Sequence, residues 1–269
     1  MIAAALVGML SLCLAQESDL VGNDQEADAL PATVVPVPST ETRAAAAGWK
    51  DGRGWSKQHE DCVALARGQR HDLILLGDSI TQSFGGDGRR TWQPARATLD
   101  SCFEGMRIAN MGISGDRTQH LLWRLQNGAL SGEAPGAYVI AIGTNNIGRD
   151  DPAAIAAGIE KIVQLLRERR QESVLLLCPI LPRGFTPEDP ARRAVDEVNR
   201  RIRPLAALDR VWWVDPQQGL LQDDGGLRTD CYGADGLHLA GPGYKAWGAA
   251  IGRALEKARV VDAEGEPLE

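Results

Sequence analysis

Short apolar runs that alternate with longer segments of helical spacing constrain the fold of this chain more than any other feature of its sequence. The runs lie at residues 73–77, 106–110, 137–143, 173–178 and 211–215. Most of them do not alternate apolar with polar residues, which is typical of strands that are covered on both faces. Alternation of strands with helices favours parallel pairing through right-handed crossovers. The sequence therefore predicts the α/β class, as a three-layer α/β/α sandwich around a parallel sheet.

The segments between these runs carry recognisable helix starts. Asp151 can cap a helix that begins at Pro152, where the missing proline N–H has no intrahelical partner. Asp189 and Pro190 repeat this start, and the apolar spacing after Gly241 predicts a last helix. In a sheet of this type, functional sites lie at the carboxyl ends of the strands.

Composition narrows the classes of function. The 269 residues are 43% hydrophobic, which is enough for one large domain. The net charge is −7 and there is no basic stripe, so we expect no nucleic-acid partner. The sequence contains no CxxC pair and no cluster of His with Cys, so we do not expect a zinc site. No Walker or G-x-G-x-x-G signature supports a nucleotide- or flavin-binding protein.

The amino-terminal residues predict export. The apolar run in residues 1–15 is too short for a stable membrane span but has the length of a signal-peptide core, with Ala15 at a suitable cleavage position. No Lys or Arg precedes the run, so a simple apolar terminus is the alternative. We expect a signal peptide at 1–15, a disordered linker at 16–48, a folded domain at 49–260 and a tail at 261–269, in a periplasmic or extracellular protein.

Four cysteines remain if the signal peptide is removed. An even number in an exported chain permits disulfide bonds, but the sequence does not supply their pairing. Cys178 lies in an apolar run, where it can be a small core residue. The other three are Cys62, Cys102 and Cys231.

A serine stands where the first apolar run ends. The chain reads Gly77–Asp78–Ser79 directly after the run, so Ser79 is expected at the carboxyl edge of the sheet. A serine hydroxyl is a poor nucleophile unless a base accepts its proton. The G-x-S-x-G elbow of α/β-hydrolases is absent around it.

Among the four histidines, His238 is the best candidate base. Asp235 precedes it by three residues in a glycine-rich loop, so the carboxylate can hold the imidazole tautomer. His59 and His71 precede the first strand and are expected to be solvated. His120 lies in an amphipathic segment, where packing or a surface position is the simpler explanation.

Two further stretches can supply hydrogen-bond donors for an oxyanion. Gly112 follows the second apolar run in "NMGISGD", and Asn145 follows the third in "IGTNN". Each also has an ordinary explanation, Gly112 as a turn residue and Asn145 as a helix cap or Asx turn. Arg117 and Arg183 can line the cleft, but salt bridges between loops are the simpler expectation for them.

Together these stretches resemble a known family. "GDSIT", "NMGISGD", "IGTNN" and "DGLHL" are similar, in order and spacing, to the four sequence blocks of the SGNH, or GDSL-type, hydrolases. The likeness extends from about Leu73 to Leu255. Within that family, "ISGDRTQHLLWRLQNG" and "PILPRG" resemble the catalytic subunits of the intracellular platelet-activating-factor acetylhydrolases.

The resemblance implies a fold and a role for each residue. The implied fold is a flavodoxin-like sandwich with a five-stranded parallel sheet, and no metal or organic cofactor is expected. Ser79 would be the nucleophile, and its own N–H would join Gly112 N–H and the Asn145 amide in the oxyanion hole. His238 would be the general base and then acid, with Asp235 as its orienting partner.

Substrate and partners are less constrained. The expected export signal departs from the intracellular subgroup, so we predict a serine ester hydrolase that removes acetyl or other short acyl groups from a carbohydrate or a small ester. A phospholipid acetylhydrolase and a non-catalytic module that binds carbohydrate or protein are the alternatives. The sequence leaves the oligomeric state open.

Overall fold

A computed structural model describes residues 30–40, 54–87 and 93–264 of the chain. The expected signal peptide at 1–15, the linker residues 16–29 and 41–48, and the tail residues 265–269 lie outside the described residues. No helix in the described ranges is long and apolar enough to cross a bilayer.

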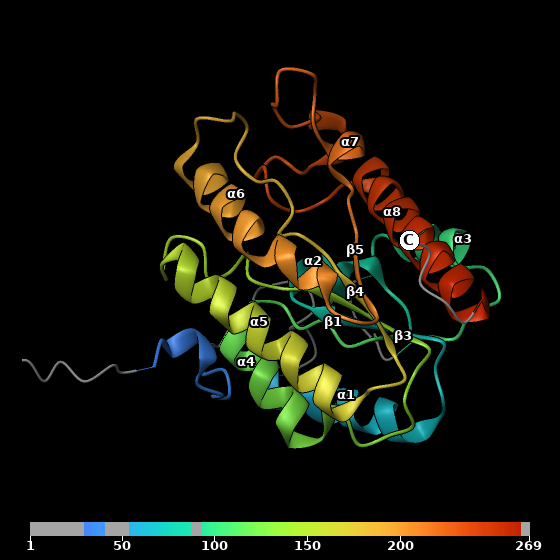
Figure 1. The fold of residues 1–269 in the computed structure, drawn as a ribbon. Coiled ribbons are helices and arrows are strands. Elements are labelled where there is room, and N and C mark those ends of the chain that lie inside the picture. Colours follow the sequence, from blue (N-terminus) through green and yellow to red (C-terminus); the bar gives the residue numbers. More distant parts are fainter. Residues whose placement is uncertain (1–29, 41–53, 88–92, 265–269) are drawn as a thin grey trace, which may run out of the picture. The chain divides into compact units, whose positions relative to one another are not determined.

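All five predicted strands are present in one parallel sheet of order β2-β1-β3-β4-β5 (Figure 1). Their register places Leu73 of β1 beside Ile108 of β2 and Ala137 of β3. Four of the five strands are shorter than their predicted ranges because the flanking residues turn into loops. The strands are β1 Leu73–Gly77, β2 Ile108–Asn110, β3 Ala137–Ala141, β4 Val174–Leu177 and β5 Val211–Trp213.

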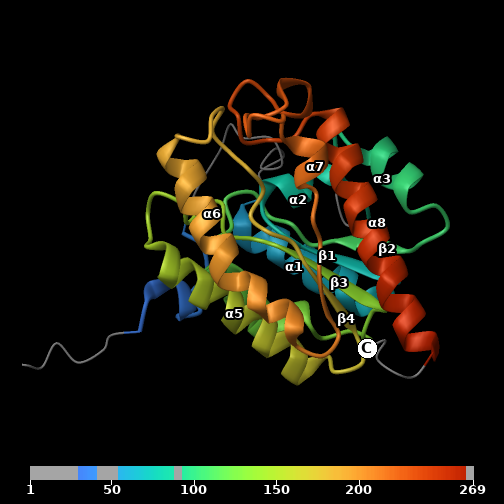
Figure 2. The same cartoon turned by 45° about the horizontal axis from the view of Figure 1, so that its top comes forward.

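Helices cover both faces of the sheet, which confirms the three-layer prediction (Figure 2). One face packs against α1 Trp55–Gly68, α4 Thr118–Arg124, α5 Pro152–Arg169 and α6 Pro190–Ile202. The other packs against α2 Ser79–Phe84, α3 Arg96–Cys102, α7 Gln217–Leu220 and α8 Gly241–Glu264. Short helical turns lie at η1 Ala32–Val34, η2 Leu125–Ala129, η3 Arg203–Ala207 and η4 Thr229–Cys231.

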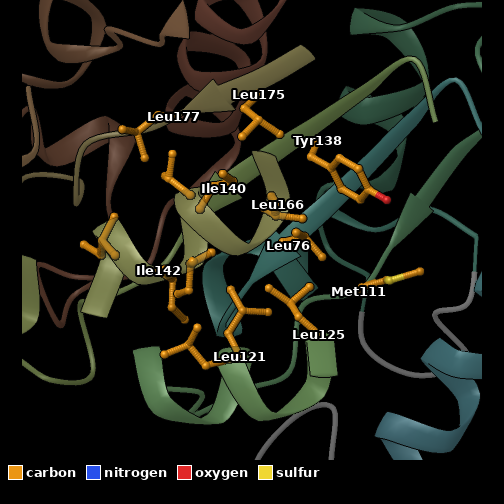
Figure 3. Close-up of a cluster of buried hydrophobic side chains, with 14 of the residues drawn as sticks. Leu76, Met111, Leu121, Leu125, Tyr138, Ile140, Ile142, Leu166, Leu175 and Leu177 are labelled. Carbon is orange, nitrogen blue, oxygen red and sulfur yellow. The ribbon is translucent and has the colours of Figure 1, made fainter. Parts of the chain in front are cut away.

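Alternate residues of each strand enter two separate cores. On one face, Leu76, Ile140 and Leu177 of the sheet meet Leu121 of α4 and Leu166 of α5 (Figure 3). On the opposite face, buried residues of the same strands pack against Tyr244 and Trp247 of α8 and their neighbours. Both sets of strand residues are therefore apolar, which explains why the sequence runs do not alternate.

The two predicted helix caps differ in their hydrogen bonds. Asp189 caps α6 by accepting a hydrogen bond from Ala191 N at 2.8 Å. Asp151 occupies the N-cap position of α5, but its side chain makes no capping bond there. The proline in the first turn is common to both helices, so it is the more reliable of the two start signals in this chain.

A segment expected to be disordered linker is docked in the structure. Thr33 is fully buried, and its hydroxyl donates to Ala154 O at 2.6 Å. Its carbonyl accepts from Thr118 Oγ1 at 3.0 Å, and Val37 N donates to Gln119 O at 3.3 Å. Residues 31–37, which we call the amino-terminal strap, therefore bind α4 and α5 (blue in Figure 1). Proline-rich composition indicated an extended conformation, but a few specific hydrogen bonds fix this segment.

The four described cysteines, Cys62, Cys102, Cys178 and Cys231, are free thiols. Cys178 is a buried core residue as predicted, and Trp247 Nε1 lies 3.4 Å from its sulfur. Burial raises the pKa of the Cys178 thiol to about 12. This thiol therefore behaves as a small apolar side chain.

Candidate active site

Ser79 is the first residue of α2 and follows β1 after a single intervening residue. That residue, Asp78, caps the helix: its Oδ1 accepts from Ile80 N at 3.0 Å and its carbonyl accepts from Gln82 N at 2.8 Å. A side chain at Gly77 would place Cβ only 2.1 Å from Thr81 Oγ1. Glycine is therefore required for this close strand-to-helix turn, which leaves Ser79 half-buried at the carboxyl end of β1.

Asp78 itself is fully enclosed, and its charge is poorly stabilised. Burial raises the pKa of Asp78 to about 7, and the hydrogen bond from Ile80 N–H opposes this only in part. Nearby His238 also lowers the pKa of Asp78, whereas Asp116 raises it. Near neutral pH the folded protein therefore holds this carboxyl in a mixture of charged and neutral forms.

The loop before α8 brings His238 to Ser79. His238 Nε2 lies 2.9 Å from Ser79 Oγ, and His238 Nδ1 lies 2.6 Å from Asp235 Oδ2. A carboxylate can only accept a hydrogen bond, so Nδ1 carries the proton and Nε2 is left to accept the hydroxyl hydrogen. The structure therefore joins all three predicted groups across 159 residues of sequence.

Backbone hydrogen bonds fix the geometry of that loop. Asp235 Oδ1 accepts from the N–H groups of Leu237 and His238, both at 3.0 Å. Gly233 N donates to His238 O at 2.7 Å. Burial acts to raise the pKa of Asp235, but the hydrogen bonds from the ring and backbone of His238 and from Leu237 N outweigh it, so this pKa lies below its usual range. Asp235 is thus held as a carboxylate beside the imidazole.

Two of the three predicted oxyanion donors, Ser79 and Asn145, keep an N–H that makes no other hydrogen bond in the described part of the chain. The N–H of Ser79 has no intrahelical acceptor because it is the first residue of α2. The side-chain amide of Asn145 donates one hydrogen to Asp116 O at 2.9 Å, which fixes its orientation. Its second hydrogen has no acceptor in the described part of the chain.

Gly112 is placed against the same turn, but its N–H is engaged. A Cβ atom at Gly112 would lie 2.5 Å from Gln82 N and 2.8 Å from Asp78 O, so only glycine fits against α2 here. Its N–H donates to Asn110 Oδ1 at 2.9 Å. The structure therefore places Gly112 against the turn that carries Ser79, and its N–H, predicted as an oxyanion donor, already has an acceptor within the protein.

Two supporting residues, Asn110 and Asp116, were not singled out from the sequence. Asn110 Nδ2 donates to Thr81 O and to Gly85 O, both at 2.6 Å, so it ties the end of β2 to α2. The buried carboxylate of Asp116 accepts from Trp55 Nε1 and from Arg124 Nη1, both at 2.6 Å. Both residues lie in the quoted "NMGISGD" stretch; Asn110 could have been noticed as a polar residue at the end of an apolar run, whereas Asp116 had no such signal.

The other histidines are buried, which differs from the expectation for two of them. His59 stacks on Trp55 with ring centroids 5.8 Å apart, and its Nε2 lies 2.9 Å from Asn127 O. Burial lowers the pKa of His59 and of His71. For His120 the expectation was packing or a surface position, and the structure shows it packed and 2% exposed. Within the described ranges none of the three contacts Ser79, and no group of three or more His, Cys, Asp or Glu residues is placed to bind a metal ion.

A hydroxyl, an imidazole and a carboxylate joined by hydrogen bonds at the carboxyl edge of a parallel sheet form the arrangement of a serine hydrolase. Comparison with known proteins gives the family. A profile of the GDSL-like lipase/acylhydrolase family matches residues 75–246. The chain belongs to this family, as its four sequence blocks predicted, and is a carboxylic ester hydrolase.

Similar proteins include a platelet-activating factor acetylhydrolase subunit and an acetylxylan esterase. Human platelet-activating factor acetylhydrolase IB subunit alpha1 is 34% identical over 221 residues, which cover 81% of this chain and 90% of that protein. A GDSL-like lipase from Bacteroides thetaiotaomicron shares the fold with a TM-score of 0.60 at 23% identity, over 76% of this chain and 97% of the other. A catalytic mutant of an acetylxylan esterase from Geobacillus stearothermophilus does so with a TM-score of 0.56 at 21% identity, over 71% and 96%.

Proposed function

We propose that this protein removes acetyl or other short acyl groups from esters through an acyl-Ser79 intermediate. One observation carries the proposal: Ser79 Oγ lies 2.9 Å from His238 Nε2, whose other ring nitrogen lies 2.6 Å from Asp235. This contact gives the hydroxyl a proton acceptor and gives the acceptor a fixed tautomer.

The proposed reaction has two halves. His238 Nε2 takes the Ser79 proton as Oγ attacks the ester carbonyl, and the resulting imidazolium is stabilised by Asp235. Collapse of the tetrahedral intermediate breaks the bond to the alcohol, which leaves with the proton from His238. Water, deprotonated by His238, then attacks the acyl-serine and releases the carboxylic acid and the free Ser79 hydroxyl.

Hydrogen-bond donors support the negative charge in both halves. We assign the oxyanion to the N–H of Ser79 and the free amide hydrogen of Asn145. Gly112 is the third donor if its hydrogen is shared between Asn110 Oδ1 and the oxyanion in a three-centre bond. Loss of one side-chain donor of this kind costs about 10²–10³ in turnover.

For the substrate, we propose an acetylated carbohydrate or another small polar ester. The side chains of His238 and Asp235 are 44% and 50% exposed, so the acid–base pair lies at an open surface. An open site suits an ester on a bulky, hydrated alcohol. The second candidate is a short-chain phospholipid, which is favoured by the 34% identity to a relative named platelet-activating factor acetylhydrolase.

A substrate panel distinguishes these two candidates. Acetylated xylan, acetylated pectin fragments, p-nitrophenyl acetate and a 2-acetyl phospholipid would be compared by kcat/KM. The carbohydrate proposal expects the largest value on an acetylated glycan. A larger value on the phospholipid would transfer the assignment to the second candidate.

The catalytic assignment is tested by Ser79→Ala. We expect this variant to lose hydrolysis of p-nitrophenyl acetate and covalent labelling by a fluorophosphonate probe. Ser131→Ala is the matched control, because the Ser131 hydroxyl is exposed and bonded to Gly128 O and Arg67. Wild-type turnover in purified Ser79→Ala would refute the assignment. Absence of labelling in the wild-type chain would instead favour a binding module.

We also propose that the protein is exported, on the sequence of residues 1–15 alone. Amino-terminal sequencing of the protein recovered outside the cytoplasm should begin at or near Gln16. An intact Met1 in that fraction would contradict cleavage.

A further inference from the structure

The segment Arg183–Phe185, after β4, contacts both loops that carry the active site. On one side it reaches the loop of Asn145, and on the other it reaches the loop of Asp235 and His238. A salt bridge between loops is the simpler sequence-based expectation for Arg183. In the described part of the chain its guanidinium has no carboxylate partner and is directed at a backbone carbonyl instead.

Arg183 forms the contact to the Asn145 loop. Its Nη1 donates to Thr144 O at 2.9 Å and lies 3.2 Å from Thr144 Oγ1. Thr144 directly precedes Asn145, whose amide is fixed from the other side by Asp116 O. The Asn145 backbone is therefore held on one side by Arg183, and its side chain is held on the other by the Asp116 carbonyl.

Gly184 and Phe185 form the contact to the acid–base loop. Gly184 N donates to Gly236 O at 3.0 Å, and Gly236 lies between Asp235 and His238 in the sequence. The Phe185 ring borders Gly236 so closely that a Cβ there would lie 3.2 Å from it. A shift of Arg183–Phe185 would therefore be transmitted to the residues that hold the imidazole.

Arg192 of α6 binds the backbone of the segment Arg183–Phe185. The residue is 3% exposed, and its guanidinium donates to three carbonyl oxygens. Nε donates to Arg183 O at 3.2 Å, Nη2 to Gly184 O at 3.0 Å and Nη1 to Gly225 O at 2.9 Å. A planar guanidinium that satisfies three carbonyls at once fixes their relative positions, which a lysine ammonium on a flexible stem does not.

We propose that Arg183 and Arg192 are positioning residues that hold the Asn145 loop and the His238 loop in one catalytic arrangement. This inference rests on the proposed function, because it assigns the two loops to oxyanion binding and proton transfer. Neither arginine needs to touch substrate. Their effect is geometric, and a displacement of about 1 Å at a catalytic group can cost about 10² in rate.

Arg183→Met tests the contact to Asn145, because methionine keeps the apolar stem and removes the donors. We expect kcat on p-nitrophenyl acetate to fall by about 10-fold with KM within about twofold, since placement and not binding is lost. In an Asn145→Ala background the same substitution should cost less than about twofold, because the group it positions is absent. Arg193→Met is the matched control: Arg193 is the exposed neighbour on α6 and donates to Glu188 O.

The double-mutant cycle separates positioning from general stabilisation. A merely structural role predicts that Arg183→Met loses the same factor with and without Asn145, and that outcome would overturn the proposal. So would wild-type kcat in Arg183→Met, or an equal loss in Arg193→Met. A Ser79→Ala variant with wild-type turnover would reject the proposed function itself, which is a separate result.

Arg192→Met tests the shared support of both loops. We expect a larger fall in kcat than for Arg183→Met, and a loss of at least about threefold should persist in the Asn145→Ala background because the Gly236 contact is also weakened. Full additivity with Asn145→Ala, or unchanged kcat, would refute the role of Arg192. If this variant does not fold, Arg192→Lys replaces it, with the same expected direction and a smaller loss.

Discussion

Asp78→Asn should make the protein more stable, and the gain should depend on pH. In the folded protein, burial raises the pKa of Asp78 to about 7. In the unfolded chain an aspartate titrates near 3.9. The folded state therefore binds this proton more tightly, so the free energy of unfolding decreases as pH rises from about 4 to about 7. Asparagine carries no charge and retains the oxygen that accepts from Ile80 N.

The magnitude follows from the two pKa values. Each pH unit between the unfolded and the folded pKa lowers the free energy of unfolding by about 1.4 kcal/mol. At pH 8 the charged Asp78 therefore lowers it by about 4 kcal/mol. At pH 5 the carboxyl is protonated in the folded state, and the same comparison gives about 1–2 kcal/mol. We therefore expect the free energy of unfolding of Asp78→Asn to exceed that of the wild type by about 4 kcal/mol at pH 8 and about 1–2 kcal/mol at pH 5.

Urea unfolding followed by circular dichroism at both pH values measures this difference. Titrating groups that do not interact with Asp78 affect both proteins alike, so the change in the difference reports Asp78 together with its coupling to His238 and Asp116. Asp215→Asn is the matched control, because exposed Asp215 accepts a similar bond from Gln217 N, two residues on. A wild-type-to-variant difference that is equal at pH 5 and pH 8, or a less stable variant at pH 8, would refute the reasoning.

Three other substitutions test separate features. Gly112→Ala should lower the free energy of unfolding by about 1–3 kcal/mol and slow fluorophosphonate labelling of Ser79, because its Cβ would lie 2.5 Å from Gln82 N. Gly252→Ala is the control: nothing lies within 4 Å of this position in α8, so the substitution should not lower stability. Thr33→Val should cost about 1–2 kcal/mol and speed amide exchange at Val37, whereas Thr33→Ser, which keeps the hydroxyl and loses only a buried methyl group, should leave that exchange unchanged. Asp235→Asn should retain more turnover than His238→Ala, because the carboxylate only orients the base; equal turnover in the two would contradict these roles.

Much of the fold and the meeting of Ser79 with His238 followed from the sequence. Buried parallel strands give apolar runs, and the carboxyl ends of such strands share one edge, so residues after the first and third runs were expected to converge. Asp235 and His238 could be paired because three residues separate them. The residue pattern therefore predicts both the local spacing of these side chains and the topology of the sheet.

Contacts between loops could not be predicted in the same way. That Asn110 accepts the Gly112 N–H, and that Arg183 reaches Thr144, depends on the paths of loops that carry no periodic signal. The same holds for the amino-terminal strap. Its proline-rich composition predicts an extended conformation but does not predict that Thr33 binds Ala154. Burial of His59 was missed because it depends on Trp123 and Asn127, which lie more than 60 residues away in the sequence.

The amino-terminal strap has a consequence for how the chain is made. Thr33 leaves the ribosome early, yet its two side-chain and backbone partners lie 121 and 85 residues further along. Until α5 has been synthesised this segment has no surface to occupy, and during that interval it is open to proteases and chaperones. Removal of everything before residue 49, the start expected from sequence, would give a domain in which the surface around Thr118 and Ala154 is left uncovered.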